Sequence, residues 1–460
     1  MRWKVLIMKS RSMDLTRGPL LAGIIQYTVP IILSSVLQLL FNAADLMVVG
    51  QFCGSISVGA VSSTGAITNL IVNLFVGLSV GAGVSVAHAI GSRSPERIHR
   101  TIHTAIPVAF FSGLFLTVVG MTFSRTFLIW MKTPAEVLPL SATYMTIYFA
   151  GITFTLLFNF GSAILQASGD TRSALIYLTM AGILNVILNL IFVICFHMNV
   201  AGVALATIIA QALSATLVIR RLMLRTDDCR FILRQSHIYR DPLLKMIRIG
   251  LPAGIQGCLF SISNVMIQSS VNSFGSATLI AGNGASSNIE GFVYTSMNAV
   301  SQATVNYVGQ NLGAQRFDRI RKILRTCLTI VAVLGISMGW TAYLFGERLL
   351  SFYITDSPEA IAFGHLRMGF ICLPYFVCGL MDVVTGSLRG LGKSLLPMLV
   401  SVLGICGFRI LWICTVFQVP RFHTPSVLYI SYLISWIVTF TVQLILFLVS
   451  SRKLQAQAGK

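Results

Sequence analysis

Long apolar segments recur from one end of this chain to the other, separated by short polar connections. A helix of about 20 apolar residues is long enough to cross the hydrocarbon core of a bilayer. The chain is 55% hydrophobic and only 10% charged, whereas about a quarter of the residues in a soluble domain are charged. Membrane-spanning strands would need alternating patterns of about ten residues, and the sequence has none. The sequence therefore predicts an all-α integral membrane protein.

The apolar segments predict twelve transmembrane helices. They lie near residues 20–49, 58–90, 101–124, 138–167, 172–196, 200–222, 243–275, 278–311, 323–346, 359–388, 394–418 and 426–450. The longest connection between them covers residues 223–242. We therefore expect most of the chain to lie within the membrane.

Basic residues gather on one side of the predicted membrane. The net charge of +19 would by itself also suit a nucleic-acid-binding protein. However, most Lys and Arg residues lie at the two termini and in the connections that follow even-numbered spans. The opposite side has only Arg125, Lys132, Arg348 and Arg421, and Arg367 and Arg409 lie within spans. Because positively charged connections stay in the cytoplasm, we expect a multi-pass cell-membrane protein with both termini cytoplasmic. Its basic residues should contact lipid headgroups, with no nucleic-acid partner.

The two halves of the chain resemble each other at an offset of about 222 residues. Pro30 corresponds to Pro252, and the segment 91–100 (GSRSPERIHR) corresponds to 313–322 (GAQRFDRIRK). Each half contains six predicted spans, an even number, so both copies have the same orientation in the membrane. We expect a pseudo-twofold axis along the membrane normal, an arrangement typical of transporters.

The repeat predicts five segments. They are a cytoplasmic amino-terminal segment (1–19), an N-lobe of helices 1–6 (20–222), a cytoplasmic linker (223–242), a C-lobe of helices 7–12 (243–450) and a cytoplasmic tail (451–460). A duplication kept only as a scaffold would leave the polar residues inside the spans unexplained.

Only three of the 14 acidic residues, Asp45, Glu290 and Asp382, lie inside the predicted spans. An ionised carboxylate at the bilayer centre costs about 2.5–3.5 kcal/mol on insertion scales, so such residues usually face a bundle interior or an aqueous cavity. Each of the three is therefore a candidate functional residue.

Asp45 ends a polar stripe on the first span. The stripe consists of Ser34, Gln38, Asn42 and Asp45. Spacings of four, four and three residues place these side chains on one face of a helix. Isolated amides often serve only to hold membrane helices together. Four polar residues in register that end in a carboxylate instead favour a water-filled cavity.

The eighth span places a carboxylate beside an aromatic ring and a thioether. One face carries Glu290, Tyr294, Met297 and Ser301. This combination suits an amphipathic cation, through charge and attraction to the ring face. Alternatively, Glu290 pairs with an internal base such as Arg409 and only holds helices together.

The seventh and tenth spans also carry polar stripes. The seventh has Ser261, Asn264, Gln268 and Asn272, and the tenth has Tyr375, Gly379, Asp382 and Arg389. For the seventh, which has no acid, helix packing and cavity lining fit equally well. For the tenth, a local ion pair between Asp382 and Arg389 is an equal alternative to substrate binding.

The fifth and sixth spans supply further oxygen atoms. Asn185 and Asn189 lie four residues apart on the fifth span, and Thr207 lies on the sixth. Near a single carboxylate they could coordinate Na⁺, which prefers oxygen ligands. They could equally tune the proton affinity of Asp45, because burial raises a carboxyl pKa and hydrogen bonds to the charged form lower it.

Several functional signatures are missing from the sequence. No GxxxxGK[ST] loop is present, so we expect no direct use of ATP. Neither HExxH nor GxSxG occurs in a span, and no TVGYG-like filter is present, which argues against an enzyme and a channel. The nine cysteines show no CxxC spacing, so we expect them to be packing residues.

These residues resemble the multidrug and toxin extrusion (MATE) family of secondary antiporters, bacterial type. The resembling segments are NAADLMVVG (42–50), LQASGDTRS (165–173), AGVALAT (201–207), VGQNLGAQ (308–315) and SLRGLGKS (387–394). The resemblance implies two six-helix lobes around a V-shaped central cavity, and efflux driven by H⁺ or Na⁺.

The resemblance also implies roles for individual residues. It maps the ion-coupling carboxylate onto Asp45, supported by Asn185, Asn189 and Thr207. Many bacterial members have Asp at the position of Asn189, so this chain lacks one charge at a Na⁺ site there. Another branch uses acids on helices seven and ten, where this chain has Gln256 and Asp382.

We therefore expect an antiporter, not an enzyme, that exports cationic amphipathic drugs or toxic organic compounds by alternating access. Its ion-coupling residues, which could also hold Na⁺, would be Asp45, Asn185, Asn189 and Thr207. Its substrate cavity would be lined by Gln38, Asn42, Asn264, Gln268, Glu290, Tyr294, Met297, Tyr375 and Asp382. We expect a monomer in contact with membrane lipids and no cofactor apart from the coupling ion. The alternatives are a flippase for lipid-linked oligosaccharides or other lipids, and a non-transporting scaffold or sensor.

Overall fold

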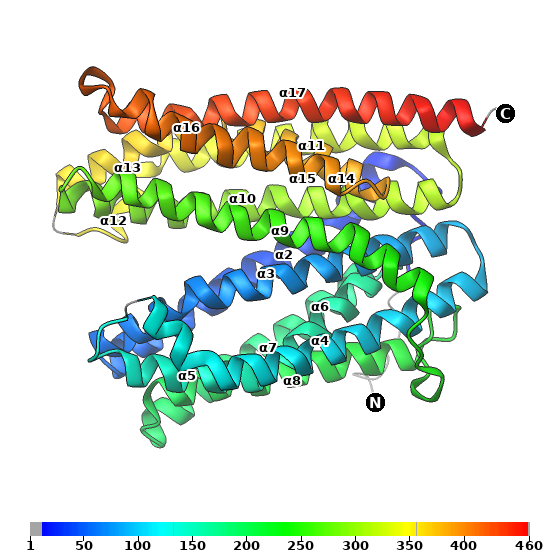
Figure 1. Cartoon of the computed structure of the whole chain (residues 1–460), viewed down its shortest axis with the longest axis horizontal. Coiled ribbons are helices and arrows are strands. Elements are labelled where there is room, and N and C mark those ends of the chain that lie inside the picture. The colour runs from blue at the N-terminus through cyan, green and yellow to red at the C-terminus, as the bar shows by residue number, and fades with distance from the viewer. Residues whose placement is uncertain (1–11, 132, 356, 459–460) are drawn as a thin grey trace. The chain divides into compact units, whose positions relative to one another are not determined.

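The structure, a computed structural model, consists mainly of helices joined by short connections (Figure 1). The residues that it describes are 12–131, 133–355 and 357–458, and they contain no strand. The predicted amino-terminal segment and carboxyl-terminal tail are therefore described only in part. The predicted all-α class is confirmed.

The twelve predicted spans correspond closely to the helices of the structure. The α-helices are α2 (Leu20–Phe52), α3 (Ser55–Gly91), α4 (Pro95–Trp130), α5 (Leu138–Ala150), α6 (Ile152–Ala167), α7 (Thr171–Leu190), α8 (Asn199–Met223), α9 (Arg240–Asn272), α10 (Ala277–Gly313), α11 (Phe317–Leu344), α12 (Gly346–Ser351), α13 (Pro358–Ile371), α14 (Tyr375–Gly390), α15 (Leu395–Ser401), α16 (Phe408–Cys414) and α17 (Pro425–Ala458). Two π-helical turns continue α7 and α15, at Ile191–Cys195 and Val402–Gly407.

Nine helical spans within the described ranges are long and apolar enough to cross a membrane. Two more arise when the bent pairs α5 with α6 (48°) and α13 with α14 (46°) are each taken as one span. Helix α10 has 37 residues and coincides with the predicted eighth span, but it is not among these nine spans, and it contains many Asn, Ser and Gln residues. These elements together account for the twelve predicted spans.

The chain forms two compact units. The first unit consists of Met1–Arg17 and Val29–Ile255, and the second of Gly18–Thr28 and Gln256–Lys460. The chain passes from one unit to the other inside α2 and α9, close to Pro30 and Pro252. Each of these two helices therefore contributes residues to both units.

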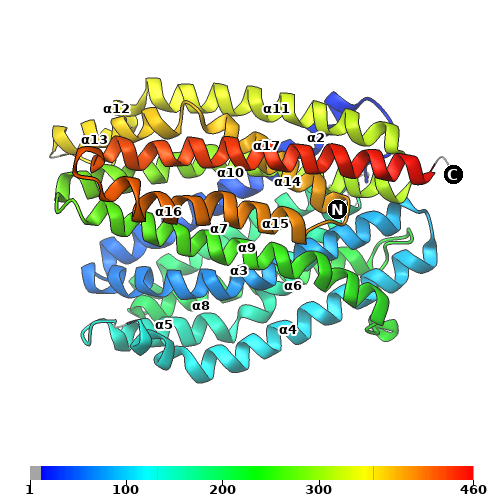
Figure 2. The same cartoon turned by 45° about the horizontal axis from the view of Figure 1, so that its top comes forward.

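In the first unit, α3, α4, α5 and α6 pack against one another, and α8 packs against α6 and α7. Figures 1 and 2 show these helices running alongside one another. Buried apolar residues from five of these helices form the main core, among them Val86, Ile102, Phe160, Tyr177 and Val218. The predicted linker lies against α4, because the Ile232 amide donates to His103 Nε2 (3.0 Å) and the Tyr239 amide donates to Thr104 Oγ1 (3.1 Å).

In the second unit, α10 packs against α11, α13 and α14, and α14 packs in turn against α17. Figure 2 labels these helices in the same part of the molecule. Most side chains of α10 that are buried are small or polar, which allows neighbouring helices to approach closely. The high polar content of α10 therefore reflects its burial among other helices of this unit.

Glycines permit a close contact between two helices in the first unit. Gly77 and Gly81 of α3 face Gly250 and Gly254 of α9. A Cβ atom added at any of these positions would meet backbone atoms of the opposite helix. A side chain larger than hydrogen would thus force the two backbones apart.

We expect Gly77→Leu to destabilise the protein by roughly 1–3 kcal/mol or more, because the surrounding backbone cannot move aside as a side chain can. Gly59→Leu is the matched control, since Gly59 also lies in α3 and a Cβ atom there would meet nothing within 4 Å. The measurement is the thermal unfolding midpoint of the purified protein in detergent. Equal midpoints for the two variants would contradict the close contact.

Candidate functional site

The structure brings Asp45 together with all three of its predicted supporting residues. Asn189 Nδ2 donates to Asp45 Oδ1 and also to Asn185 Oδ1 (3.3 Å). Asn185 Nδ2 donates to Thr207 Oγ1 (3.3 Å), and this hydroxyl donates to the carbonyl oxygen of Val203 (2.9 Å). A continuous chain of hydrogen bonds therefore joins α2, α7 and α8 inside the first unit.

A second contact holds α7 against α8 at the amino-terminal end of α7, far from Asn185 and Asn189. The Asp170 side chain caps the start of α7 by accepting from the Ser173 amide (3.1 Å). The same carboxylate pairs with Arg221 Nη2 of α8 (3.2 Å). This contact sets the register between α7 and α8, and with it the position of Asn185 opposite Thr207.

An apolar cluster adjoins the chain of hydrogen bonds at Asp45. Val49, Val193 and Val203 are buried in this cluster, and Tyr144 of α5 packs on it. Asn189 is fully buried, whereas Asp45 is half-buried. The Oδ1 atom of Asn189 is buried with no hydrogen-bond partner among the described residues. A half-buried carboxylate beside an unsatisfied amide oxygen can accept a proton or a small cation.

The other three residues of the predicted stripe on α2 differ in their surroundings. Ser34 donates to the carbonyl oxygen of Pro30 (2.8 Å), so its hydroxyl is satisfied within the helix. Gln38 and Asn42 are exposed in the structure. Their amides remain accessible to water or to a ligand.

Glu290 forms a buried two-point ion pair with Arg367 of α13. Arg367 Nε and Nη2 donate to the two carboxylate oxygens at 2.9 and 2.8 Å. Only 4% of Glu290 and 6% of Arg367 are exposed. An ion pair was the alternative for Glu290, but the suggested partner Arg409 is wrong, since Arg367 occupies that position. Sequence reasoning placed Arg367 inside a span without assigning it a role.

The ion pair belongs to a wider polar network. Arg367 Nη1 donates to Asn283 Oδ1 (2.6 Å), which also accepts from the Tyr429 hydroxyl (3.2 Å). Asn283 Nδ2 donates to Gln268 Oε1 (2.9 Å), and Gln268 Nε2 donates to Asn272 Oδ1 (3.0 Å). Gln268 of the predicted stripe on α9 thus connects α9 to α10, and Asn272 is bonded to it within α9.

All but one of the remaining candidates in the second unit border a pocket with a volume of about 230 Å³, which we call the aromatic pocket. It is lined by Phe260, Ser261, Ser263, Asn264, Tyr294, Tyr375, Cys378, Met381, Asp382, Ile405, Arg409, Tyr432 and Trp436. Four of the predicted cavity residues therefore lie together: Asn264, Tyr294, Tyr375 and Asp382. Met297 is fully buried between α10, α11 and α14, with its sulfur against Gly335 and Gly379, and does not line this pocket.

Asp382 and Arg389 do not form the local ion pair that sequence reasoning offered as an alternative. Arg389 Nη2 donates instead to Gln256 Oε1 (2.8 Å). The Oδ2 atom of Asp382 is buried without a hydrogen-bond partner among the described residues, and the Tyr294 hydroxyl lies close enough to interact with this carboxylate. Asp382 thus remains available to a ligand.

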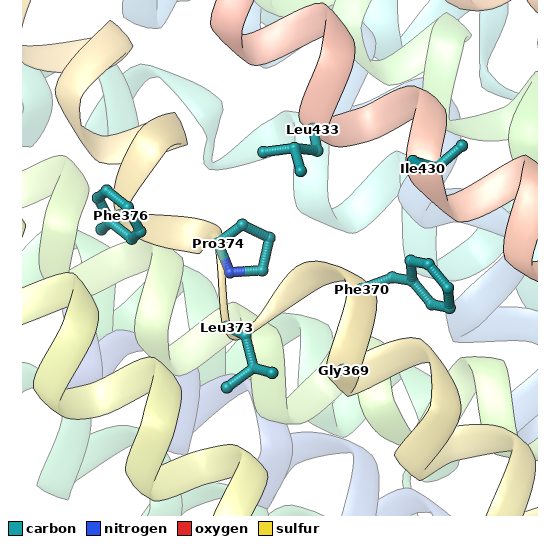
Figure 3. Close-up of a pocket in the computed structure, with 7 residues that line it drawn as sticks. All are labelled: Gly369, Phe370, Leu373, Pro374, Phe376, Ile430 and Leu433. Carbon is teal, nitrogen blue, oxygen red and sulfur yellow. The ribbon is translucent and has the colours of Figure 1, made fainter.

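A second pocket lies at the bend between α13 and α14 (Figure 3). Its volume is about 390 Å³, and its wall is formed by Gly369, Phe370, Leu373, Pro374, Phe376, Ile430 and Leu433. Pro374 lacks an amide hydrogen and disfavours helical geometry in the residue before it, which accounts for the break there. Because the wall carries no polar side chain, this pocket offers no group for an ion or a charged substrate.

Comparison with known proteins agrees with the duplication in the sequence. The sequence profile of the MatE family matches residues 30–191 and again residues 252–414. Among solved structures, an outward-facing multidrug resistance MATE family transporter of the MOP superfamily is similar, with a TM-score of 0.88 and 19% identity, covering 97% of this chain and 100% of that one.

Relatives from Bacillus subtilis are similar over most of their length. The probable multidrug resistance protein YpnP is 26% identical, covering 87% of this chain and 89% of its own. The probable multidrug resistance protein YoeA is 25% identical, covering 84% of both chains. Because the family profile matches well over half of the chain, the protein belongs to the MatE family, whose members are membrane transporters and not enzymes.

Proposed function

We propose that this protein is a secondary antiporter of the cell membrane that exports cationic amphipathic drugs or toxic organic compounds in exchange for a coupling ion. Both termini would lie in the cytoplasm. The observation that carries the proposal is the hydrogen-bonded chain from Asp45 through Asn189 and Asn185 to Thr207. The names of the relatives, which describe probable multidrug resistance proteins, support the substrate class.

Asp45 is the residue we propose to carry the coupling ion. It has no basic partner among the described ion pairs, so its charge is free to change during a transport cycle. Binding of an ion at Asp45 would stabilise one conformation of the protein, and binding of the drug would stabilise another. Transport is coupled to the extent that the two ligands prefer different conformations.

The directions of the hydrogen bonds favour H⁺ over Na⁺ as the coupling ion. Asn189 presents its amide nitrogen to Asp45, and Asn185 presents its nitrogen to Thr207. The Thr207 hydroxyl is directed at a backbone carbonyl. A hard cation requires several oxygen ligands that converge on it, whereas a proton requires one accessible carboxylate oxygen. This arrangement supplies few converging oxygens and one half-buried carboxylate.

We further propose that Glu290 stabilises the second unit and does not bind substrate. Both of its oxygens are occupied by Arg367, and the residue is almost fully buried. A cationic drug would have to displace a two-point ion pair to reach this carboxylate.

Asp45→Asn should abolish efflux of a cationic dye, because the amide cannot take up or release a proton. The measurement is dye efflux from vesicles that contain purified protein. The variant and the unaltered protein are compared at the same amount of protein, after their thermal unfolding midpoints have been shown to be equal. Glu347→Gln is the matched control, since it removes one acidic charge from the short helix α12. Full efflux by the Asp45 variant would refute the assignment.

A pH gradient alone should drive dye efflux from such vesicles, whereas a Na⁺ gradient alone at symmetrical pH should not. The reason is that Asn189 presents its amide nitrogen to Asp45, so few oxygen atoms converge there to bind Na⁺. Flux that requires Na⁺ and ignores the pH gradient would show that Na⁺ is the coupling ion instead.

Glu290→Gln should lower the stability of the protein by about 3–5 kcal/mol, because the buried Arg367 charge loses its counter-charge. Replacing both residues with apolar ones of similar size, Glu290→Leu with Arg367→Met, should restore much of this loss. The measurement is the thermal unfolding midpoint in detergent. An unchanged midpoint together with lost dye binding would assign Glu290 to the substrate instead.

A further inference from the structure

Two side chains of opposite charge line the aromatic pocket without pairing with each other. Asp382 of α14 and Arg409 of α16 both border it, and only 9% and 5% of these residues are exposed. Neither takes part in any of the ion pairs found among the described residues. A buried charge without a counter-charge is costly. An acid and a base that stay apart in one pocket therefore suggest a ligand that contacts both.

The guanidinium group of Arg409 is oriented by its neighbours. It lies over the ring of Tyr432, 3.9 Å from the ring centroid, and 6.0 Å from the centroid of Trp436. Its Nε donates to Ser435 Oγ (3.3 Å), and the structure gives the two Nη atoms no bond to any described residue. A guanidinium edge of this kind can bind a carboxylate with two parallel hydrogen bonds.

The Asp382 carboxylate offers acceptors for a cationic group. Its Oδ2 atom is buried and has no partner among the described residues. The backbone at Asp382 is held in place because Ser301 Oγ donates to its carbonyl oxygen (2.7 Å). The Tyr294 hydroxyl and the charge of Arg389 act on this carboxylate, but Arg389 donates its hydrogen bond to Gln256 and forms no ion pair with Asp382. A protonated amine would bring a positive charge and hydrogen-bond donors directly to Oδ2.

Aromatic rings form the wall between these groups. Tyr294 and Tyr375 are stacked with their centroids 6.3 Å apart and an interplanar angle of 26°. Tyr375 is also stacked on Trp436, at 5.4 Å and 25°. Stacked rings present flat apolar surface to another ring. The volume of about 230 Å³ is below the roughly 300–1,000 Å³ typical of pockets for drug-sized ligands.

We propose that the aromatic pocket binds small aromatic zwitterions, in the size range of an aromatic amino acid. Arg409 receives the carboxylate, Asp382 receives the ammonium group, and the ring lies against Tyr294, Tyr375 and Trp436. The proposal rests on the proposed export function and extends its substrate class from cations to zwitterions. It also assigns a role to Arg409, which neither the sequence motifs nor the family match assigns.

The first test uses the unaltered protein and three ligands with the same ring system. Tryptophan carries both charges, tryptamine lacks the carboxylate, and indole-3-propionate lacks the amine. By titration calorimetry of the purified full-length protein in lipid nanodiscs, we expect tryptophan to bind at least about tenfold more tightly than either of the others. Equal affinities for tryptophan and tryptamine would overturn the proposal.

Variants then assign each charge to its residue. Arg409→Gln should bring the affinity for tryptophan down to that for tryptamine, and Arg409→Lys should restore part of the difference. Asp382→Asn should likewise remove the preference for tryptophan over indole-3-propionate. Arg421→Gln, an exposed arginine outside the pocket, is the control and should bind tryptophan as the unaltered protein does. An unchanged preference in the Arg409 and Asp382 variants would overturn the proposal, and the ligand series tests it even where a variant fails to fold.

Failure of this proposal can be distinguished from failure of the export function. Asp45→Asn should still bind tryptophan, because Asp45 lies in the first unit, outside the residues that line the pocket. The same variant should not export tryptophan under a pH gradient. Normal dye efflux without tryptophan binding overturns only the pocket assignment, whereas tryptophan binding without any gradient-driven flux overturns only the antiport mechanism.

Discussion

Glu290 and Arg367 join α10 to α13 through two charge-assisted hydrogen bonds, and Asn283 and Tyr429 extend the contact to α17. Removing either charge would leave the other buried and unpaired, which is far more costly than removing both. We infer that this requirement specifies how the three helices pack. The aromatic pocket depends on it, because Tyr432 and Trp436 of α17 lie one and two turns beyond Tyr429.

The same physical constraint separates structural charges from functional ones. Glu290, Arg367 and Asp170 are neutralised by partners inside the protein. Asp45 and Asp382 are inside the spans as well, yet neither has a basic partner within ion-pair distance. A transporter needs charges whose partners change during the cycle. Unpaired acids inside the spans fit that need, and a permanently paired acid does not.

Sequence reasoning located the spans from local patterns, and the resemblance to the MATE family grouped Asn185, Asn189 and Thr207 with Asp45. Apolar length defines a span, and the spacing of Asn185 and Asn189 places them on one helix face. The partner of Glu290 was not predictable in this way, because Arg367 lies on a helix 77 residues further along the chain. Only tertiary packing decides which of several basic residues reaches a given acid. Met297 shows the same limit, since helical spacing placed it beside Tyr294 but packing against two glycines buried it.

The duplication preserved the helical scaffold but not the charges. At the position that corresponds to Asp45, the second half has Ile267, which is a buried core residue. At the position that corresponds to Glu290, the first half has Thr68. An acid in one half therefore has no acid in the other to replace it. If Asp45 carries the coupling ion and the aromatic pocket binds substrate, the two units have divided these tasks. Exchanging residues between the corresponding positions should then not transfer either function, because the hydrogen-bonded chain at Asp45 lies in the first unit and the aromatic pocket lies in the second.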